Sequence, residues 1–319
     1  MTQGASVQVL MLFLDGVGIG RRDPDVNALI AAHLPSLRSL LGGEIPTLDR
    51  RGVTASPAVA FPLDATLGIP GLPQSGTGQA ALFAGVNASR IAGKHFGPYP
   101  YSTLRPIIAR QNIFKRCLDA GFTTCFANAF PKRFFDYMKH HGSRLSVTTL
   151  SCTQTGIPLL QGADLVAGHA VSADITNEGW KNLGHPDIEV LKPAEAGRRL
   201  AKISAHHDFV LFEYWKTDYA GPSRDMKEAI RVLERFDAML GGILDALDST
   251  RTLLLITSDH GNIEDMSVKT HTRHPVPLIL YGHKHKETAA LLQAKSRPSL
   301  PHVIPAIMEI LAESRARHS

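Results

Sequence analysis

The amino-acid sequence predicts a three-layer α/β/α fold, in which helices cover both faces of a mainly parallel β-sheet. Short apolar runs typical of buried strands recur along the chain, and segments with helical periodicity lie between them. Hydrophobic residues make up 44% of the 319 residues, which is enough to fill one large core. We therefore expect residues 1–319 to form a single domain with a small lid.

Five runs rich in Val, Ile, Leu, Phe and Thr are predicted as buried strands. They are residues 7–14, 121–129, 209–214, 252–258 and 275–282. Residues 225–247 have apolar residues at helical spacing on one face, and residues 303–311 show a similar pattern. Strands and helices thus alternate along the chain, as they do in proteins with a parallel sheet.

Two segments have a weak pattern and are the expected lid: residues 93–110 and 132–193. Gly, Pro and His are frequent there, and basic residues cluster near the start of the second segment. Such a segment is either a solvated loop or a cover over an anionic substrate, because long loops without regular structure are often functional. The sequence leaves both interpretations open.

Composition argues against several classes of partner. The net charge of +5 is modest and forms no basic arm, so we expect no nucleic-acid partner. The apolar run 7–14 is too short to cross a membrane. Cys117, Cys125 and Cys152 have no disulfide-type spacing, which is typical of a reducing cytosol. We expect a cytoplasmic protein without a membrane partner, and the oligomeric state stays open.

The pair Asp259-His260 follows the predicted strand 252–258 directly. Ligands of open α/β sheets bind where strands end. A carboxylate beside an imidazole is a ligand set suited to Zn²⁺ or Mn²⁺. The alternative is a helix-capping Asp followed by a surface His. Asp15, which follows the first predicted strand and precedes Gly16, is a further candidate ligand.

Ser75 lies just before residues 77–84, which are predicted as a helix. A serine in this position is often only an N-cap. The positive end of a helix also favours an alkoxide and an incoming phosphate, so Ser75 is the candidate nucleophile and Thr77 a secondary candidate. Asp218 and His271, which lie beside the third and fifth predicted strands, are the remaining candidate ligands.

Together these segments resemble the metal-binding core of the alkaline phosphatase superfamily, and within it the branch of cofactor-independent phosphoglycerate mutase and phosphopentomutase. The matching motifs are Asp15-Gly16, Gln74-Ser75-Gly76-Thr77-Gly78-Gln79, Asp218-Tyr219-Ala220-Gly221-Pro222, Asp259-His260-Gly261-Asn262 and His271-Thr272-Arg273-His274-Pro275-Val276-Pro277. Each motif alone is weak. Their common order supports the fold and leaves the middle of the chain unassigned.

The resemblance implies two divalent metal ions, Mn or Zn, and a phosphoserine intermediate. One ion would be held by Asp15, Ser75, Asp259 and His260. The second would be held by Asp218 and His271. The implied activity is phosphoryl transfer from a small anionic phosphate ester, with Arg90, Lys94, His95 and Lys216 as candidate substrate-binding residues.

Two positions depart from the family pattern. Pro222 replaces a histidine ligand of the second metal, and Gln79 replaces the final histidine of the nucleophile motif. His274, His95 or Asp225 could fill the vacant corner, or the site could bind metal weakly. The short interval between Ser75 and Asp218 leaves little room for the mutase cap, which favours a phosphohydrolase. A phosphomutase and a metal-binding pseudoenzyme are the alternatives.

Overall fold

A computed structural model describes residues 7–54, 57–141 and 144–316. A six-stranded sheet forms its centre, in the order β2-β9-β8-β1-β7-β3. The strands are β1 (Gln8–Leu14), β2 (Val59–Leu63), β3 (Thr124–Phe126), β7 (Phe209–Tyr214), β8 (Thr252–Thr257) and β9 (Val276–Gly282). Because β1 pairs in parallel with both β7 and β8, the first strand of the chain occupies the middle of the sheet.

The edge of the sheet departs from a purely parallel arrangement. β9 runs antiparallel to β8, and β2 pairs antiparallel with β9. β2 was not predicted from the sequence. Its sequence VAFPL contains Pro62, which weakens a strand pattern because proline is tolerated mainly at sheet edges, where β2 lies. The sheet is therefore mainly parallel with an antiparallel edge.

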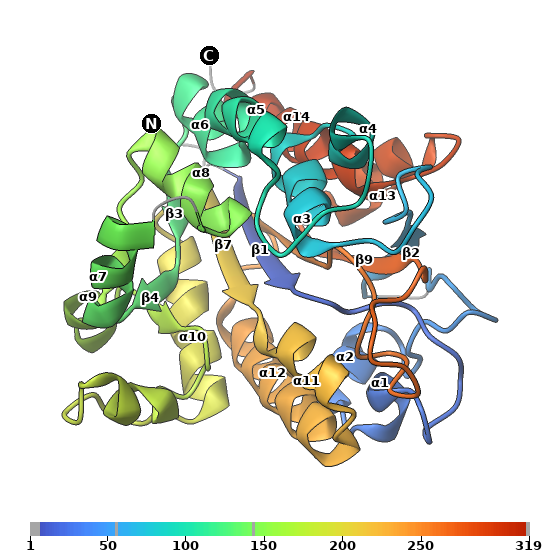
Figure 1. The fold of residues 1–319 in the computed structure, drawn as a ribbon, viewed down its shortest axis with the longest axis horizontal. Helices are drawn as coiled ribbons and strands as arrows, with labels where there is room; N and C mark the ends of the chain where they lie inside the picture. Colours follow the sequence, from blue (N-terminus) through green and yellow to red (C-terminus); the bar gives the residue numbers. More distant parts are fainter. Residues whose placement is uncertain (1–6, 55–56, 142–143, 317–319) are drawn as a thin grey trace.

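Helices cover both faces of the sheet, so the predicted three-layer fold is confirmed (Figure 1). Alternate residues of β1 belong to two separate cores: Val9, Met11 and Phe13 face one, and the leucines between them face the other. The first layer contains α3 (Ser75–Ala84), α5 (Arg105–Gln111), α6 (Ile113–Asp119), α8 (Val147–Thr155), α13 (His285–Gln293) and α14 (Val303–Ala316). The second contains α1 (Ala28–Ala31), α2 (Pro35–Leu40), α10 (Pro193–Ser204) and α12 (Met226–Ala246).

The predicted helix at residues 225–247 is α12. The Asp225 side chain caps it by accepting hydrogen bonds from the amides of Lys227 and Glu228. Val232, Phe236 and other apolar residues of one face are buried in the second core. The predicted helix at 303–311 is the first part of the longer α14.

Prediction of one strand at residues 121–129 was wrong. The segment divides into β3 and β4 (Asn128–Phe130), and β4 belongs to a second sheet with β5 (Leu160–Gln161) and β6 (Val171–Ser172). Asn128 lies at the division, where its side chain bonds both the carbonyl and the amide of Glu213 at 2.8 Å. These side-chain bonds take the place of a continued strand pairing with β7.

Much of the expected lid is ordinary structure. Within 93–110, α5 packs in the first core. Within 132–193 lie α7 (Lys132–His141), α8, α9 (Gly162–Val166) and the 3₁₀ helix η2 (Glu178–Leu183). The sequence VTTLSCTQT of α8 lacks a polar face because Val147 to Cys152 are all buried, and this explains why no helical pattern was recognised. Residues 142–143 of the expected lid lie outside the described residues.

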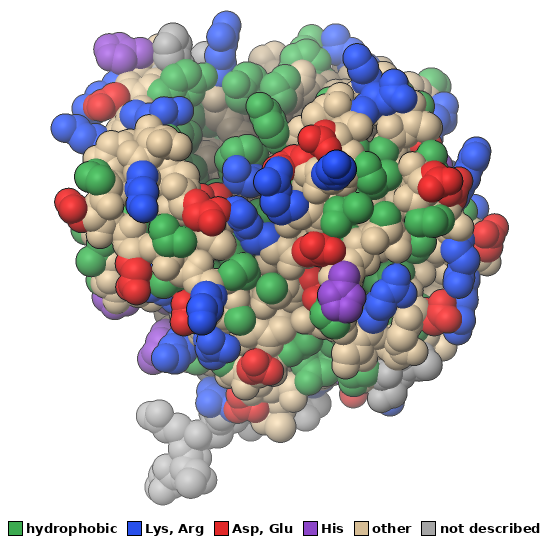
Figure 2. Space-filling model, turned by 90° about the horizontal axis from the view of Figure 1, so that it is seen from below, with side chains coloured by type: hydrophobic (Ala, Val, Ile, Leu, Met, Phe, Trp, Pro, Cys, Tyr) green, Lys and Arg blue, Asp and Glu red, His purple; other side chains and the backbone are tan. Residues whose placement is uncertain are grey.

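The surface agrees with the modest net charge. On the face in Figure 2, basic and acidic side chains are interspersed, so no charge of a single sign dominates it. Among the described helices, none combines the length and apolar character needed to cross a membrane. The three cysteines are free.

Candidate metal centre

The ends of three adjacent parallel strands bring the predicted ligands together. Asp15 directly follows β1, and Asp259 and His260 follow β8 after one intervening residue. Asp218 lies in the first turn of α11 (Lys216–Ser223), which follows β7. Because the carboxyl ends of parallel strands meet at one edge of the sheet, residues far apart in sequence converge there.

His260 lies at the middle of the cluster. Its Nε2 is 3.0 Å from the Ser75 hydroxyl, 3.3 Å from Asp15 Oδ1 and 3.6 Å from Asp259 Oδ2. Asp15, Asp259 and His260 are all buried, and their ligand atoms lie close enough together to hold one metal ion. We call these three residues the closed half of the centre.

Asp218 and His271 form a more accessible part, which we call the open half. Asp218 Oδ1 is 3.5 Å from His271 Nε2 and 4.0 Å from His260 Nε2. The two imidazole rings stack with centroids 3.8 Å apart and planes 13° apart. His271 is oriented by its Nδ1, which donates to the carbonyl of Pro73 at 2.8 Å. This leaves its Nε2 directed at Asp218 as a ligand.

Both halves use the same imidazole nitrogen. The two groups of candidate ligands in the described chain are Asp15-Asp259-His260 and Asp218-His260-His271. One Nε2 lone pair binds one ion. If it serves the closed half, the open half retains Asp218 and His271 as its protein ligands.

The closed half fits a divalent cation. Within the described chain, Asp15 Oδ1 and Asp259 Oδ2 are buried without a hydrogen-bond partner. Buried carboxylate oxygens are costly unless hydrogen-bonded, paired with a cation or bound to a metal. Two such oxygens beside one imidazole nitrogen suit Zn²⁺ or Mn²⁺. The residues therefore fit the metal implied by the sequence.

The protonation of the cluster reflects its excess negative charge. Burial lowers the pKa of His260, but the carboxylates of Asp259 and Asp15 outweigh it and raise the pKa to about 10. Burial, reinforced by the Asp15 charge, raises the pKa of Asp259 well above its ordinary value. Burial and the nearby His260 lower the pKa of His271, so the stacked rings do not both favour the charged form. The cluster is a strong attractor for a cation.

Ser75 occupies the first turn of α3. The sequence placed it just before a helix at 77–84, but the helix begins at Ser75 and its N-cap is Gln74, whose backbone is extended. Ser75 is therefore not the capping residue. Its hydroxyl lies at the positive end of the helix and faces His260. The Thr77 hydroxyl instead donates to the Gln74 carbonyl and accepts from the Phe96 amide, which makes it part of the turn.

Gln79, one of the two departures from the family pattern, contacts the closed half. Its Nε2 donates to Asp15 Oδ2 at 3.2 Å. The amide therefore orients Asp15 while the other carboxylate oxygen, Oδ1, faces His260. In this chain Gln79 supports a ligand.

Asp218 is held by Asn262 of the Asp-His-Gly-Asn turn. Asn262 Nδ2 donates to Asp218 Oδ1 at 2.7 Å. Two glycines permit this arrangement. A Cβ at Gly221 would lie 2.2 Å from Asn262 Oδ1, and one at Gly16 would lie 2.7 Å from Asp218 Oδ1. Gly16 also has a φ of 72°, which favours glycine.

None of the three residues suggested for the corner of Pro222 belongs to a ligand group of the described chain. His95 contacts the Ser89 hydroxyl and the Ile69 carbonyl. His274 pairs with Glu264, and Asp225 caps α12. Pro222 itself is exposed on α11. Among the described residues, no side chain therefore takes the place of the histidine that the resemblance implies.

The sequence analysis missed Glu264, which joins the loops of the centre. This buried carboxylate accepts hydrogen bonds from the amides of Gly18 and Asn262 and from the Thr272 hydroxyl, and its Oε1 lies 3.0 Å from His274 Nδ1. Although burial opposes it, these bonds hold the pKa of Glu264 below its ordinary value. A carboxylate two residues after Asn262 in the same turn was the available signal.

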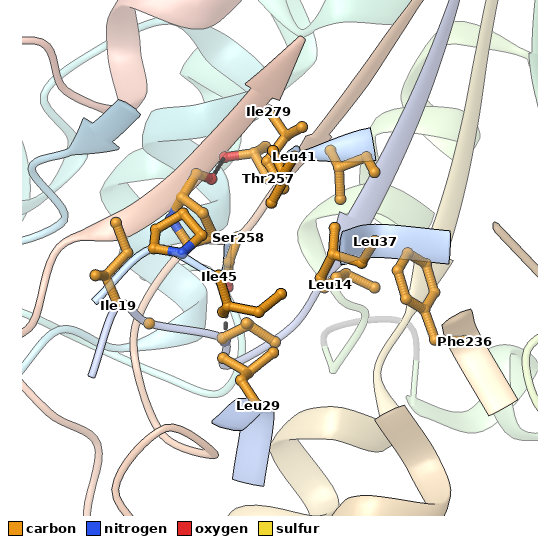
Figure 3. A pocket seen from close by; sticks show the side chains of 15 residues that line it. Leu14, Ile19, Leu29, Leu37, Leu41, Ile45, Phe236, Thr257, Ser258 and Ile279 are labelled. Carbon is orange, nitrogen blue, oxygen red and sulfur yellow. Dashed lines mark hydrogen bonds between the residues drawn. The ribbon is translucent and has the colours of Figure 1, made fainter. Parts of the chain in front are cut away.

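Leu14 and Ser258, the sequence neighbours of Asp15 and Asp259, take part in the lining of a mainly apolar cavity (Figure 3). Its volume is about 40 Å³, and Leu14, Phe236 and Ile256 are among the side chains that line it. Ser258, at its margin, accepts from the Val17 amide at 2.8 Å. Apolar side chains therefore lie next to the candidate ligands, and a low local dielectric strengthens charge interactions.

Only two of the four predicted substrate-binding residues line the cleft next to the candidate nucleophile. Lys94 and His95 line an open cleft of about 480 Å³ together with Gln74, the neighbour of Ser75. Lys216 precedes Asp218 on α11 and is half-buried. Arg90 is exposed on α4 (Ala88–Ala92), and the structure does not bring it into the cleft lining.

Part of the chain matches known metalloenzymes. Residues 189–314 match the family model of the Metalloenzyme superfamily. A 2,3-bisphosphoglycerate-independent phosphoglycerate mutase of Desulforudis audaxviator is 32% identical over 133 residues, covering 38% of this chain. The match spans only 25% of that relative's length.

Two solved structures share the fold across the chain. An alkaline phosphatase from the Antarctic bacterium TAB5 has a TM-score of 0.52 at 11% identity and covers 97% of this chain and 99% of its own. A phosphoglycerate mutase of Leishmania mexicana has a TM-score of 0.50 at 13% identity, covering 98% and 96%. The chain resembles the alkaline phosphatase superfamily. The predicted resemblance is thus confirmed: the chain shares its fold with these two structures, and residues 189–314 match the metalloenzyme family model.

Proposed function

We propose that the chain is a divalent-metal-dependent phosphohydrolase that cleaves small phosphate esters with Ser75 as its nucleophile. The observation that carries this proposal is the approach of Ser75 Oγ to His260 Nε2, at 3.0 Å, inside a ring of three Asp carboxylates. A buried hydroxyl at a helix N-terminus beside a metal-type cluster is suited to phosphoryl transfer.

The residues of the chain divide the chemistry between them. Bound divalent ions would supply Lewis-acid stabilisation of the phosphoryl oxygens and lower the pKa of the serine hydroxyl. Ser75 Oγ gives its proton to water and forms a bond to phosphorus while the bond to the ester oxygen breaks, and the leaving alkoxide takes a proton back from water. A water molecule then attacks phosphorus, the bond between phosphorus and Ser75 Oγ breaks, and Oγ takes a proton from the attacking water, which leaves phosphate and free Ser75. The positive end of α3 stabilises negative charge throughout.

The polar side chains around the cleft supply binding. We propose that Lys94 and His95 contact the part of the substrate that does not react, because they line the cleft next to Gln74-Ser75. Lys216 would attract the substrate from the side of α11. The role of Arg90 stays a prediction, as do the cytoplasmic location, the choice between Mn and Zn, and the absence of a nucleic-acid partner.

Most of the chain between Ser75 and Asp218 builds the two cores, and this favours hydrolysis over mutase chemistry. Helices α5, α6, α8 and α10 and strands β3 and β7 of that interval belong to the two cores. What remains is the small second sheet with its adjoining helices. A mutase must retain its intermediate while the phosphoryl group returns, whereas a hydrolase needs only water.

The test uses purified protein stripped of metal and then loaded with Mn²⁺ or Zn²⁺. A panel of phosphomonoesters, including phosphoglycerates and pentose phosphates, is assayed for phosphate release and for isomerised product. Ser75→Ala should lower turnover by about 10⁴-fold or more, as removal of a nucleophile does. Ser102→Ala, at an exposed serine, is the matched control. Unchanged turnover in Ser75→Ala would refute the mechanism, and isomerised product would indicate the mutase.

A second candidate, a metal-binding protein without catalysis, is supported by the exposed Pro222 and the shared His260. Metal counting separates it from the first. Two tightly held ions per chain together with turnover would exclude it. One ion and no turnover on any ester would favour it.

A further inference from the structure

Two exposed aromatic side chains flank Asp218 at the start of α11. Trp215 is 42% exposed and Tyr219 is 78% exposed, although large aromatic rings are usually buried. Positions three and four residues apart are neighbours on a helix, and the Tyr219 amide bonds the Trp215 carbonyl at 3.4 Å. Both rings therefore lie within one helical turn of Asp218, a candidate ligand of the open half.

The two rings form an ordered pair with a cation beside it. Their centroids are 6.4 Å apart and their planes make an angle of 89°, which is the favourable edge-to-face arrangement. Lys216 Nζ lies 5.3 Å from the centre of the Trp215 ring. This cation–π contact holds a positive charge next to the aromatic surface.

The pair is small. The exposed residues that follow it, Pro222 and Ser223 of α11 and the C-cap Arg224, add no aromatic surface. A stable protein interface buries about 800 Å² on each partner, which two rings do not provide. A flat ring of a small molecule, by contrast, needs only one or two aromatic side chains on which to stack.

We infer that Trp215 and Tyr219 form a subsite for a planar ring in the alcohol part of the phosphate ester. The substrate class is then ring-bearing phosphomonoesters, such as nucleoside monophosphates or aryl phosphates. With the phosphate at Ser75, the ring lies against α11 and Lys216 attracts the negative charge of the ester, while Lys94 and His95 of the cleft contact the rest of the part that does not react. This inference rests on the proposed function, because it assigns the substrate of the same site.

The first experiment compares the loss of kcat/KM across substrates in Trp215→Ala and Tyr219→Ala. Stacking on one aromatic side chain changes affinity by about 5- to 100-fold, so a loss of this size is expected for a nucleoside 5′-monophosphate or phenyl phosphate. Glycerol phosphate, which has no ring, should be little affected. Taking the ratio of variant to wild type for each substrate cancels differences in leaving-group reactivity. Val166→Ala, at another exposed residue, is the matched control.

The kinetic outcomes separate the two proposals. Equal losses for all substrates, or none for ring-bearing ones, would overturn the aromatic subsite while leaving the Ser75 mechanism intact. Trp215→Phe should restore the preference for a ring, which a fault in folding would not allow. Absence of turnover on every ester would refute the proposed function itself and leave the second experiment to decide on the subsite.

The second experiment measures binding without catalysis, in Ser75→Ala. The chain has two tryptophans, and Trp180 is 2% exposed, so quenching by a stacked ring reports on Trp215. A nucleoside monophosphate should quench the emission of Ser75→Ala, and glycerol phosphate should not. The same nucleotide should leave the emission of Ser75→Ala combined with Trp215→Phe unchanged. Equal quenching by both ligands, or quenching that persists without Trp215, would contradict the inference.

Discussion

The closed half of the metal centre is held by the sheet, whereas the open half is held by side chains. Asp15 and the Asp259-His260 pair follow the paired strands β1 and β8, and their side chains are between 0% and 11% exposed. Asp218 and His271 come from a helical turn and a loop and are 28% and 16% exposed. The backbone of the closed half is fixed by strand pairing. The open half depends on Asn262 and on the Pro73 carbonyl.

This difference indicates which half of the centre tolerates the substitution of a ligand. In the closed half every residue implied by the superfamily resemblance is present, and a substitution there would leave buried charge uncompensated. In the open half Pro222 occupies an exposed position, where loss of a ligand costs the fold little. We therefore expect metal affinity to differ between the halves, with the first ion bound in the closed half.

The largest expected effect follows from Asp259→Asn. It removes a buried carboxylate ligand while keeping the shape, so metal affinity of the closed half should fall by more than the roughly 10- to 100-fold typical of residues behind a ligand. Calorimetric titration with Mn²⁺ measures the effect. Asp245→Asn, exposed on α12, is the control; equal affinities would contradict the assignment.

A smaller loss is expected for Glu264→Gln. The amide cannot accept from all four donors that Glu264 serves, so the loops carrying Asp259, Asn262 and His271 should loosen together. We expect metal affinity to fall by about 10- to 100-fold. Titration with Mn²⁺ checks this, and retention of wild-type affinity despite a lower unfolding temperature would show that Glu264 supports only the fold.

Pro222→His should have the opposite effect and strengthen metal binding in the open half. An imidazole four residues after Asp218 on α11 restores the ligand type of the family, so affinity for the second ion should rise about tenfold or more, a change of about 1.4 kcal/mol. Affinity for the first ion should not change. Pro222→Ala separates the added imidazole from the removal of proline. If both variants titrate like wild type, another group already completes the open half.

Glu213→Gln in β7 is expected to affect the metal centre least. Its effect is on the pH dependence of stability. Burial, partly offset by the Thr148 hydroxyl, raises the pKa of Glu213 from 4.5 to about 7. The folded state then binds more protons than the unfolded state between these values, so the free energy of unfolding should decrease as pH rises from about 4.5 to 7. The total is on the order of 3 kcal/mol. Denaturant unfolding at pH 5 and pH 8 should show a weaker decrease in Glu213→Gln.

The sequence was most informative where burial is complete. Strands β1, β7 and β8 lie between two helical layers, so their sequences are continuous apolar runs that no other element resembles. The residues after them could be assigned to one site because parallel strands end together. Ser75, Asp218 and His271 were placed by motif order, and the structure brings all three to His260.

The features that escaped prediction depend on contacts between distant residues. Pro62 concealed the edge strand β2. The Asn128 side chain bonds the backbone of Glu213 where pairing with β7 would otherwise continue. An apolar run in the sequence does not indicate this contact. The role of Glu264 arises from donors on three separate loops. Both halves share His260 because of interatomic distances, and the order of motifs along the chain does not give these distances.

The central position of β1 has a consequence for the synthesis of the chain. Its partners β7 and β8 begin about two hundred residues later, at Phe209 and Thr252. On the ribosome the apolar first strand therefore emerges long before either neighbour exists. Contacts this distant in sequence slow folding and leave apolar surface exposed meanwhile. Asp15 meets Asp259 and His260 only when most of the last third of the protein has been made, so keeping the nascent chain in solution is part of assembling the candidate metal centre.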